Sequence, residues 1–304
     1  MVVDLGVRAR PTAPPVPPQR PRRGDHPLVF LVPAFAVLAV FFVLPTVFNF
    51  VYAFTDWSSF KPGIAFAGLQ NFQTLLADGS LLSSLRITLV YAVLVAIFQN
   101  LFGLALALLL ERDTMINRFA RAAFFVPVLM SALAVGYIFQ ALLRPDGALN
   151  DILGRPGEIA WLGSTTWTVV VVAIVHAWKW MGLSMLIYLA GLKTMPQDVL
   201  EAARIDGASW WQTFRLIRFP LLAPAITFNV ATALLGSMNG FDIVAATTEG
   251  GPARTTEVLN IFIFRTFGQG LFAQATTMSL VLFVVVVALA FPVIRTLRKR
   301  EEVL

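Results

Sequence analysis

The chain has 304 residues, of which 58% are hydrophobic and 13% charged, and its formal net charge is +6. A soluble domain would carry about 25% charged residues, so the composition excludes an ordinary soluble protein and favours an integral membrane protein. The lack of cysteine excludes a disulfide framework and a thiolate metal site.

The first 27 residues are polar and rich in proline and arginine. Six prolines lie between Pro11 and Pro21, among five arginines. A segment of this composition cannot bury a core, so residues 1–27 are predicted to be a disordered cytoplasmic tail. The apolar run that follows is too long for the h-region of a cleaved signal peptide.

Six apolar segments are long enough to cross a bilayer, which takes about 20 helical residues. The predicted fold is therefore all-α, a polytopic membrane protein with six transmembrane helices in one domain over residues 28–297, followed by a cytoplasmic tail over 298–304. Pro33 and Pro45 lie inside the first segment and are expected to bend it. The six segments are 28–54, 87–110, 122–143, 167–192, 221–246 and 275–297.

Basic residues are distributed unequally between the two sides of this arrangement. With the N-terminus inside, the cytoplasmic segments hold sixteen Lys and Arg and the outer loops hold six, while Lys179 lies within the membrane. The positive-inside rule then predicts that both termini and the polar segment 194–220 are cytoplasmic. Because the basic residues lie at membrane edges, the pattern argues against nucleic-acid binding.

The longest polar interruption in the second half of the chain is the segment 194–224. Pro196 suits the first position of a helix, and Gly207 is the residue best able to end that helix in a left-handed conformation. Asp206 stands at the C-terminus of this predicted helix, where a carboxylate is unfavourable. Its side chain is therefore expected to cap the following turn or to meet a partner.

A second short helix is predicted after the glycine. Ser209 followed three residues later by Gln212 has the pattern of a capping box, and the helix is expected to stop before Pro220. On the residues alone, this two-helix segment is either a solvated amphipathic linker between membrane spans or a docking element for a partner.

The residues of this segment resemble the EAA loop of ABC importer permeases. The resemblance is to the carbohydrate-type membrane subunit of a binding-protein-dependent importer, and it implies the type I ABC importer permease fold. Arg215 and Arg218 make the second helix more basic than the family pattern, which we interpret as contact with lipid phosphates. The matching residues are Glu201-Ala202-Ala203, Asp206-Gly207-Ala208, Trp211-Gln212, Phe219-Pro220-Leu221-Leu222 and Pro224. Those that the resemblance implies to sit in the groove of an ATPase are Glu201, Ala202, Ala203, Asp206, Gly207 and Ala208.

The resemblance also implies a function and a set of partners. The chain would translocate a carbohydrate or related polyol that an extracytoplasmic binding protein delivers, coupled to a separate cytoplasmic ABC ATPase dimer. A second permease subunit, expected to form a heterodimer, and membrane lipid would complete the assembly in the plasma or inner membrane. The alternative is an ATP-independent secondary transporter or channel for a polar solute, although neither an internal repeat nor paired membrane carboxylates are apparent.

Several chemistries have no signature in the sequence. There is no phosphate-loop motif, so ATP would be bound by the partner ATPase and not by this chain. Two histidines and no cysteine leave too few ligands for a dedicated transition-metal site. There is no nucleophile elbow and no paired-histidine zinc motif, so no enzymatic activity and no cofactor are expected in this chain.

Polar residues inside the predicted spans are candidates for the solute pathway. In the fifth span, Asn229, Thr232, Gly236 and Asn239 are spaced 3, 4 and 3 apart and form one stripe. Amides and a hydroxyl suit a polyhydroxylated solute, because each amide offers both donors and an acceptor. The alternative is helix–helix packing, where small and amide residues also gather.

The fourth span carries a lysine near mid-depth. Lys179 lies one turn from His176 and has a tryptophan on either side. A charge at this depth costs about 3 kcal/mol on insertion scales, so Lys179 is expected to face the bundle interior and to pair with Asp242 or with a partner subunit. The pathway candidates are Lys179, Asn229, Thr232, Asn239 and Asp242, with Gln99, Asn100 and Gln140 as weaker ones.

The last predicted outer segment covers residues 247–274. It opens with Glu249-Gly250-Gly251-Pro252, a turn signal, and residues 258–267 are expected to form a short amphipathic element on the outer surface. The Gly-Gly-Pro followed by Thr255-Thr256 also resembles the sequence that carbohydrate permeases carry between their last two spans. That resemblance implies a position near a docked binding protein, and the alternative is a packed surface loop.

Overall fold

The structure is a computed structural model that describes residues 28–301. The predicted tail 1–27 and residues 302–304 of the predicted C-terminal tail lie outside the described residues. Within them the chain is nearly all helical, with one isolated antiparallel bridge between Thr55 and Phe66. The predicted all-α fold class is confirmed. The chain divides into two compact units, one ending at Val47 and the other beginning at Phe48.

The described part of the first unit is one apolar helical segment. It consists of α1 (Leu28–Leu38), the π-helical turn η1 (Ala39–Val43) and the start of α2 (Leu44–Tyr52). In the wide turn the N–H of Leu44 bonds to the carbonyl of Ala39, five residues back. Pro45 follows directly, and a proline ring crowds the carbonyl four residues before it, so the wide turn gives this proline room.

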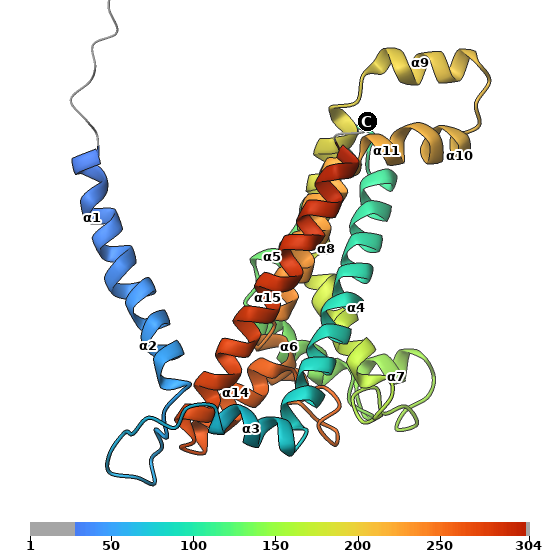
Figure 1. The fold of residues 1–304 in the computed structure, drawn as a ribbon. Helices are drawn as coiled ribbons and strands as arrows, with labels where there is room; N and C mark the ends of the chain where they lie inside the picture. The colour runs from blue at the N-terminus through green and yellow to red at the C-terminus, as the bar shows by residue number, and fades with distance from the viewer. Residues whose placement is uncertain (1–27, 302–304) are drawn as a thin grey trace, which may run out of the picture. The chain divides into compact units, whose positions relative to one another are not determined.

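Three long apolar helices form the body of the second unit (Figure 1): α4 (Ser80–Leu109), α8 (Thr168–Lys193) and α15 (Phe272–Glu301). Helices α4 and α8 pack along each other. In its apolar window α8 is 56% buried, against 28% for the corresponding windows of α4 and α15. Helix α8 is therefore the central helix of the unit.

Two of the predicted spans are sharply bent, one within its length and one at its start. Helices α5 (Met115–Leu129) and α6 (Ala132–Leu142) meet at 101°, and the segment Trp210–Leu221 meets α12 (Ala223–Met238) at 67°. The described residues contain four helices long and apolar enough to cross a membrane, or six if each bent pair is one span. Broken helices are tolerated at membrane depth where protein groups satisfy the freed backbone.

The predicted fifth span, 221–246, also ends earlier than expected. Helix α12 stops at Met238, and after a turn the separate helix α13 (Asp242–Thr247) begins. In this turn a Cβ on Gly240 would lie 2.8 Å from the carbonyl oxygen of Ser237 and 3.2 Å from the ring of Tyr91. The break therefore depends on a residue without a side chain at this position.

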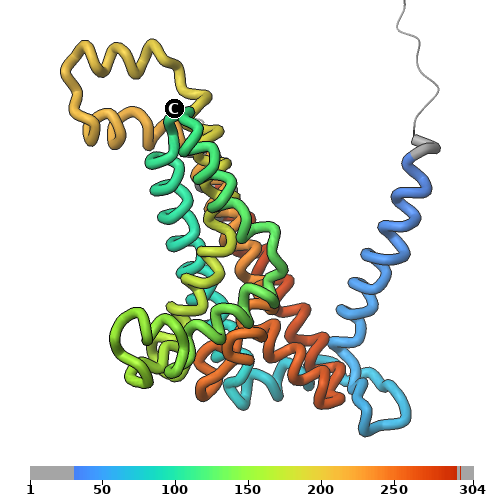
Figure 2. The backbone as a smooth tube through the Cα atoms, turned by 180° about the vertical axis from the view of Figure 1, so that it is seen from behind, coloured from blue at the N-terminus to red at the C-terminus, as the bar shows by residue number. Residues whose placement is uncertain are grey.

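The two ends of the second unit carry different elements (Figures 1 and 2). At one end, α9 (Gln197–Ile205), α10 (Trp210–Thr213), η2 (Phe214–Arg218) and α11 (Phe219–Leu221) form a projecting pair of arms, and we call residues 194–222 the polar hairpin. At the other end lie α3 (Gln70–Ala77), α7 (Ala148–Ile152) and α14 (Leu259–Gly268). Helix α14 confirms the predicted element at 258–267, and its buried Leu259 and Ile261 also place it in the core.

Candidate functional site

The first arm of the polar hairpin ends as its sequence predicts. Helix α9 begins directly after Pro196, which is its N-cap, and Gly207 follows its last turn with φ of +73°. The N–H of Gly207 bonds to the carbonyl of Arg204 at 3.1 Å, and the N–H of Ala208 bonds to that of Ala203 at 2.9 Å. These two bonds form a Schellman motif, which fixes the direction in which the chain leaves α9.

The second arm begins with the predicted capping box. The Ser209 hydroxyl accepts a hydrogen bond from the Gln212 N–H, and the Gln212 side chain accepts one from the Ser209 N–H at 2.8 Å. The predicted stop before Pro220 is wrong, because the helix continues to Leu221. The reason is again a π-helical turn, in which the N–H of Phe219 bonds to the carbonyl of Phe214 and makes room for the proline.

The family-like residues of the hairpin divide into an exposed group and a packed group. Glu201, Ala202, Asp206 and Gly207 are exposed, Ala208 is half-buried and Ala203 is buried. The Asp206 carboxylate has no hydrogen bond or ion pair to any described residue, so the expected cap on the following turn is not formed. Of the two expectations for Asp206, contact with a partner is the one left open.

Among the described residues, the hairpin is attached to the helix bundle by apolar packing and by an ion pair. Leu200 and Leu222 are buried in a cluster with Tyr188 and Leu192 of α8. The Arg218 guanidinium lies 2.8 Å from the Glu111 carboxylate in the loop between α4 and α5, and its side chain is 14% exposed. The interpretation of Arg218 as a ligand of lipid phosphates is therefore wrong, because a carboxylate of the same chain neutralises it.

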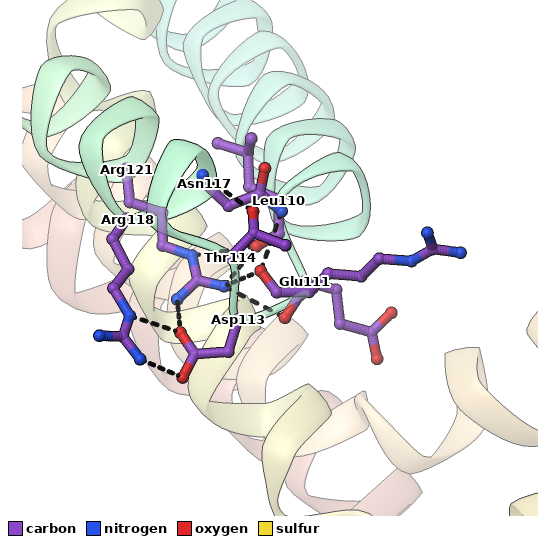
Figure 3. Close-up of polar contacts among 8 residues, drawn as sticks. Leu110, Glu111, Asp113, Thr114, Asn117, Arg118 and Arg121 are labelled. Atoms are coloured by element: carbon purple, nitrogen blue, oxygen red, sulfur yellow. Dashed lines mark hydrogen bonds and ion pairs between the residues drawn. The ribbon is translucent and has the colours of Figure 1, made fainter.

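The loop between α4 and α5 is itself held together by charged side chains (Figure 3). Arg121 donates hydrogen bonds to the backbone carbonyls of Leu110, Glu111 and Arg112. Arg118 forms two hydrogen bonds with the Asp113 carboxylate, and this guanidinium holds the pKa of the carboxyl below its usual range. These contacts order the loop that carries Glu111, the ion-pair partner of Arg218.

A cavity of about 290 Å³ lies between the helices of the bundle, and we call it the central cavity. Its polar lining combines amides, hydroxyls, an imidazole, an indole and a carboxylate, which can donate and accept hydrogen bonds and stack on a ring. Helix α4 supplies Gln99, α8 supplies His176 and Trp180, α12 supplies Thr232, Gly236 and Ser237, and Asn239, Gly240 and Asp242 come from the break before α13 and its first residue.

Three of the five predicted pathway residues line this cavity: Thr232, Asn239 and Asp242. The other two do not. Asn229 is 1% exposed and donates a hydrogen bond to the Ser184 carbonyl of α8, so it packs one helix against another. The predicted stripe is thus split along its length, with its first member turned to α8 and the later ones to the cavity.

Lys179 occupies a place that the sequence did not indicate. Its ammonium donates a hydrogen bond of 3.2 Å to the carbonyl of Val128, near the end of α5, and lies 4.3 Å from the ring centroid of Trp180. The expected pair with Asp242 is not formed. A cation at a helix C-terminus satisfies an orphan carbonyl there, so the break between α5 and α6 explains why a lysine is buried at this depth.

Buried hydrogen bonds position the side chains behind the cavity wall. The Tyr91 hydroxyl lies 2.7 Å from Nδ1 of His176, and Gln99 donates to the Ser184 hydroxyl at 2.9 Å. Sequence reasoning named His176 and Gln99 but missed Tyr91 and Ser184. Tyr91 lies eight residues before Gln99, on the same face of α4, and this spacing was the available signal.

The remaining weaker candidates are bound within the protein. Asn100 accepts a hydrogen bond from the Tyr188 hydroxyl at 2.5 Å, and Gln140 donates to the Thr247 carbonyl at 3.3 Å.

A second, wider cavity of about 400 Å³ adjoins the first and shares Asn239 and Phe241 with it. The rest of its lining is Asn260, Ile263, Phe264 and Phe267 of α14.

The chain resembles known proteins in sequence and in structure. Residues 99–299 match the family described as "Binding-protein-dependent transport system inner membrane component". A "Probable starch degradation products transport system permease protein AmyD" from Thermoanaerobacterium thermosulfurigenes is 32% identical over 90% of this chain and 94% of its own length. The "Multiple sugar-binding transport system permease protein MsmF" from Streptococcus mutans is 29% identical over 84% of this chain and 90% of its own length.

A solved structure has the same fold. It is the crystal structure of a bacterial ABC transporter involved in the import of alginate, in which a chain superposes with a TM-score of 0.77 at 22% identity, covering 90% of this chain and 94% of that chain. The likeness confirms the predicted permease fold. Because the family match covers more than half of the sequence, the chain belongs to the inner membrane components of binding-protein-dependent ABC transport systems, and it is a multi-pass membrane permease rather than an enzyme.

Proposed function

We propose that the chain moves a carbohydrate or related polyol through an importer driven by a separate ABC ATPase dimer. The observation that carries the proposal is that helices α8 and α12 both line the central cavity and lead directly into the polar hairpin. Movement of the hairpin would therefore displace two of the helices that line the cavity. Rigid helices that move as units are the usual carriers of such coupling.

The hairpin has the features of a docking element for the ATPase. Glu201 and Asp206 are exposed and have no partner among the described residues, while Leu200 and Ala203 anchor the same helix from below. The Schellman motif and the capping box make the bend between the arms stiff, so a force on one arm reaches the other. Glu201, Ala202, Ala203, Asp206, Gly207 and Ala208 are the proposed coupling residues.

The chemistry of the central cavity supports a sugar-like solute. Hydroxyl groups need many donors and acceptors at close range, and Gln99, Thr232 and Asn239 supply both beside the indole of Trp180. Thr232, Asn239 and Asp242 are the proposed solute contacts. Relatives named for lactose in Rhizobium radiobacter and for trehalose and maltose in Thermococcus litoralis agree with this class.

The proposed assembly has the hairpin and both termini in the cytoplasm. The excess of Lys and Arg on that side supports this orientation. The partners would be the ATPase dimer, an extracytoplasmic solute-binding protein, a second permease in a heterodimer, and lipid. A solved structure with the same fold is that of a bacterial alginate ABC transporter in complex with alginate pentasaccharide-bound periplasmic protein, which supports the binding-protein partner.

Reconstitution tests the proposal. The complete importer in proteoliposomes, supplied with its binding protein, should take up at least one of maltose, trehalose or lactose only when ATP is present at the hairpin side. Omitting the ATPase, or replacing ATP by ADP, should stop uptake. Uptake that continues without the ATPase would favour the alternative, an ATP-independent transporter or channel.

A further inference from the structure

A carboxylate is buried in the segment that connects α13 with α14. Glu257 has a side chain that is 1% exposed, although it belongs to a loop. It forms ion pairs with two arginines, Arg254 at the loop tip and Arg265 on α14, and Oε1 lies 2.5 Å from Nη1 of Arg265. A buried carboxylate is costly unless it is paired, so these two cations are needed to hold Glu257 where it is.

The loop around this carboxylate has an unusual backbone. Glu249, Ala253 and Arg254 have φ values of 51°, 45° and 64°. A left-handed conformation costs a residue with a side chain roughly 1–2 kcal/mol, so it persists only where the surroundings enforce it. Arg265 also donates a hydrogen bond to the carbonyl of Glu249, at the other end of the strained stretch. The ion pairs therefore hold the loop 249–256 in one conformation.

This loop is joined to the end of α13 by hydrogen bonds. The hydroxyls of Thr248 and Thr256 lie 2.8 Å apart, and the Thr256 hydroxyl donates to the carbonyl of Gly251 at 2.7 Å. The N–H of Gly251 in turn bonds to the carbonyl of Thr248 at 2.8 Å. A Cβ on Gly250 would lie 3.3 Å from Cα and Cβ of Glu257, so the loop packs closely on the backbone of this residue.

Helix α13 is also a wall of the central cavity. Its first residues, Asp242 and Ile243, line the cavity, and its last residues lead into the loop 249–256. With six residues the helix is too short to be held by its own hydrogen bonds. Its position therefore depends on its packing, in which Ile243, Val244 and Ala246 are buried against α6 and α8, and on the loop that joins its C-terminal end.

We infer that Glu257 is a positioning residue for transport: its ion pairs with Arg254 and Arg265 hold the loop 249–256 and, through it, the α13 wall of the central cavity in the arrangement that receives the solute. This inference rests on the proposed function of the cavity. Glu257 itself does not line the cavity and acts only through the loop. Its loss is expected to weaken solute binding and to leave the hairpin, at the other end of the bundle, unaffected.

The test compares Glu257→Gln with wild type in the complete reconstituted importer, using the sugar that the wild-type importer transports best. Networks of this kind modulate coupling by about 0.5–2 kcal/mol, so the half-saturating sugar concentration should rise by about 2- to 30-fold while the maximal rate stays nearly constant. Arg265→Gln should give a similar rise. The double variant should add little, because both changes break the same pair.

Arg144→Gln is the matched control, since it removes an exposed ion pair with Asp146 at the same end of the bundle. Hydrogen exchange of residues 249–256 gives a readout that needs no transport: it should be faster in Glu257→Gln and unchanged in Arg144→Gln. Should the exchange and the half-saturating concentration both match wild type in Glu257→Gln and in Arg265→Gln, the inference is overturned. A fall in maximal rate alone also overturns it. Failure of the wild type to transport any sugar would instead contradict the proposed function.

Discussion

Arg218 and Glu111 lie 107 residues apart in sequence and form an ion pair of 2.8 Å where the polar hairpin meets the loop between α4 and α5. The hairpin is thereby attached to α4 and α5 as well as to α8 and α12. Because the Arg218 side chain is only 14% exposed, this pair is less screened by water than an ordinary surface pair. It offers a second route by which movement of the hairpin reaches the bundle.

Reversing the charge at one end of this pair should impair coupling. Arg218→Glu places two carboxylates side by side, and uptake by the complete importer should fall by about 2- to 30-fold at unchanged protein amount. The double variant Arg218→Glu with Glu111→Arg should recover most of the rate, while Arg215→Glu, at an exposed neighbouring position, should have little effect. If the double variant is as slow as the single one, the pair does not act as described.

A proline at the bend of the hairpin should uncouple it. Gly207 has φ of +73° and its N–H is bonded to Arg204, whereas proline fixes φ near −65° and has no N–H. Gly207→Pro should abolish ATP-driven uptake and leave membrane insertion intact. Gly154→Pro is the control, since Gly154 has φ of +68° and a similar N–H bond in a loop at the other end. Normal uptake by Gly207→Pro would refute the coupling role of the bend.

The two asparagines of the predicted stripe should behave differently. Asn239 lines both cavities, so Asn239→Leu removes hydrogen-bonding groups from the solute path and should raise the half-saturating sugar concentration. Asn229 instead faces α8 and donates a hydrogen bond to the Ser184 carbonyl, so Asn229→Leu should leave that concentration nearly unchanged. Uptake kinetics over a range of sugar concentrations decide this, and equal effects of the two changes would contradict the assignment.

Close packing of α5 on α8 should make Gly182 intolerant of a side chain. A Cβ there would lie 2.3 Å from the carbonyl oxygen of Phe124 and 2.9 Å from Cα of Phe125. Gly182→Ala should therefore destabilise the protein by about 1–3 kcal/mol, as overpacking commonly does. Gly236→Ala on α12 meets no atom within 4 Å and should not lower stability. Thermal unfolding in detergent compares the two, and equal melting temperatures would show that α5 packs less closely.

The sequence predicted the hairpin well because its signals are local. Gly207 ends a helix through its own backbone freedom, and Ser209 with Gln212 caps the next helix within four residues. Such features depend on neighbouring residues only. The continuation of the helix through Pro220 was missed because a π-helical turn has no sequence signature comparable to that of a proline.

The cavity was predicted only in part because it depends on breaks in two helices. An apolar run such as 122–143 does not reveal that α5 ends at Leu129. Hydropathy shows how long an apolar segment is, but not whether its helix changes direction within that length. Because this break was not predicted, the sequence indicated no free backbone carbonyl for Lys179, and the partners considered were Asp242 and a partner subunit. The ion pair between Arg218 and Glu111 could likewise not be predicted, because no local sequence pattern links residues so far apart in the chain.

ATPase binding by the hairpin is the central claim, and charge reversal on its exposed face tests it most directly. Glu201→Lys combined with Asp206→Lys alters two exposed carboxylates that have no partner among the described residues and touches none of the buried anchors. The account predicts that the ATPase, which co-purifies with the wild-type permease, is lost from this variant while the permease remains folded. Retention of the ATPase at the wild-type level would contradict the account.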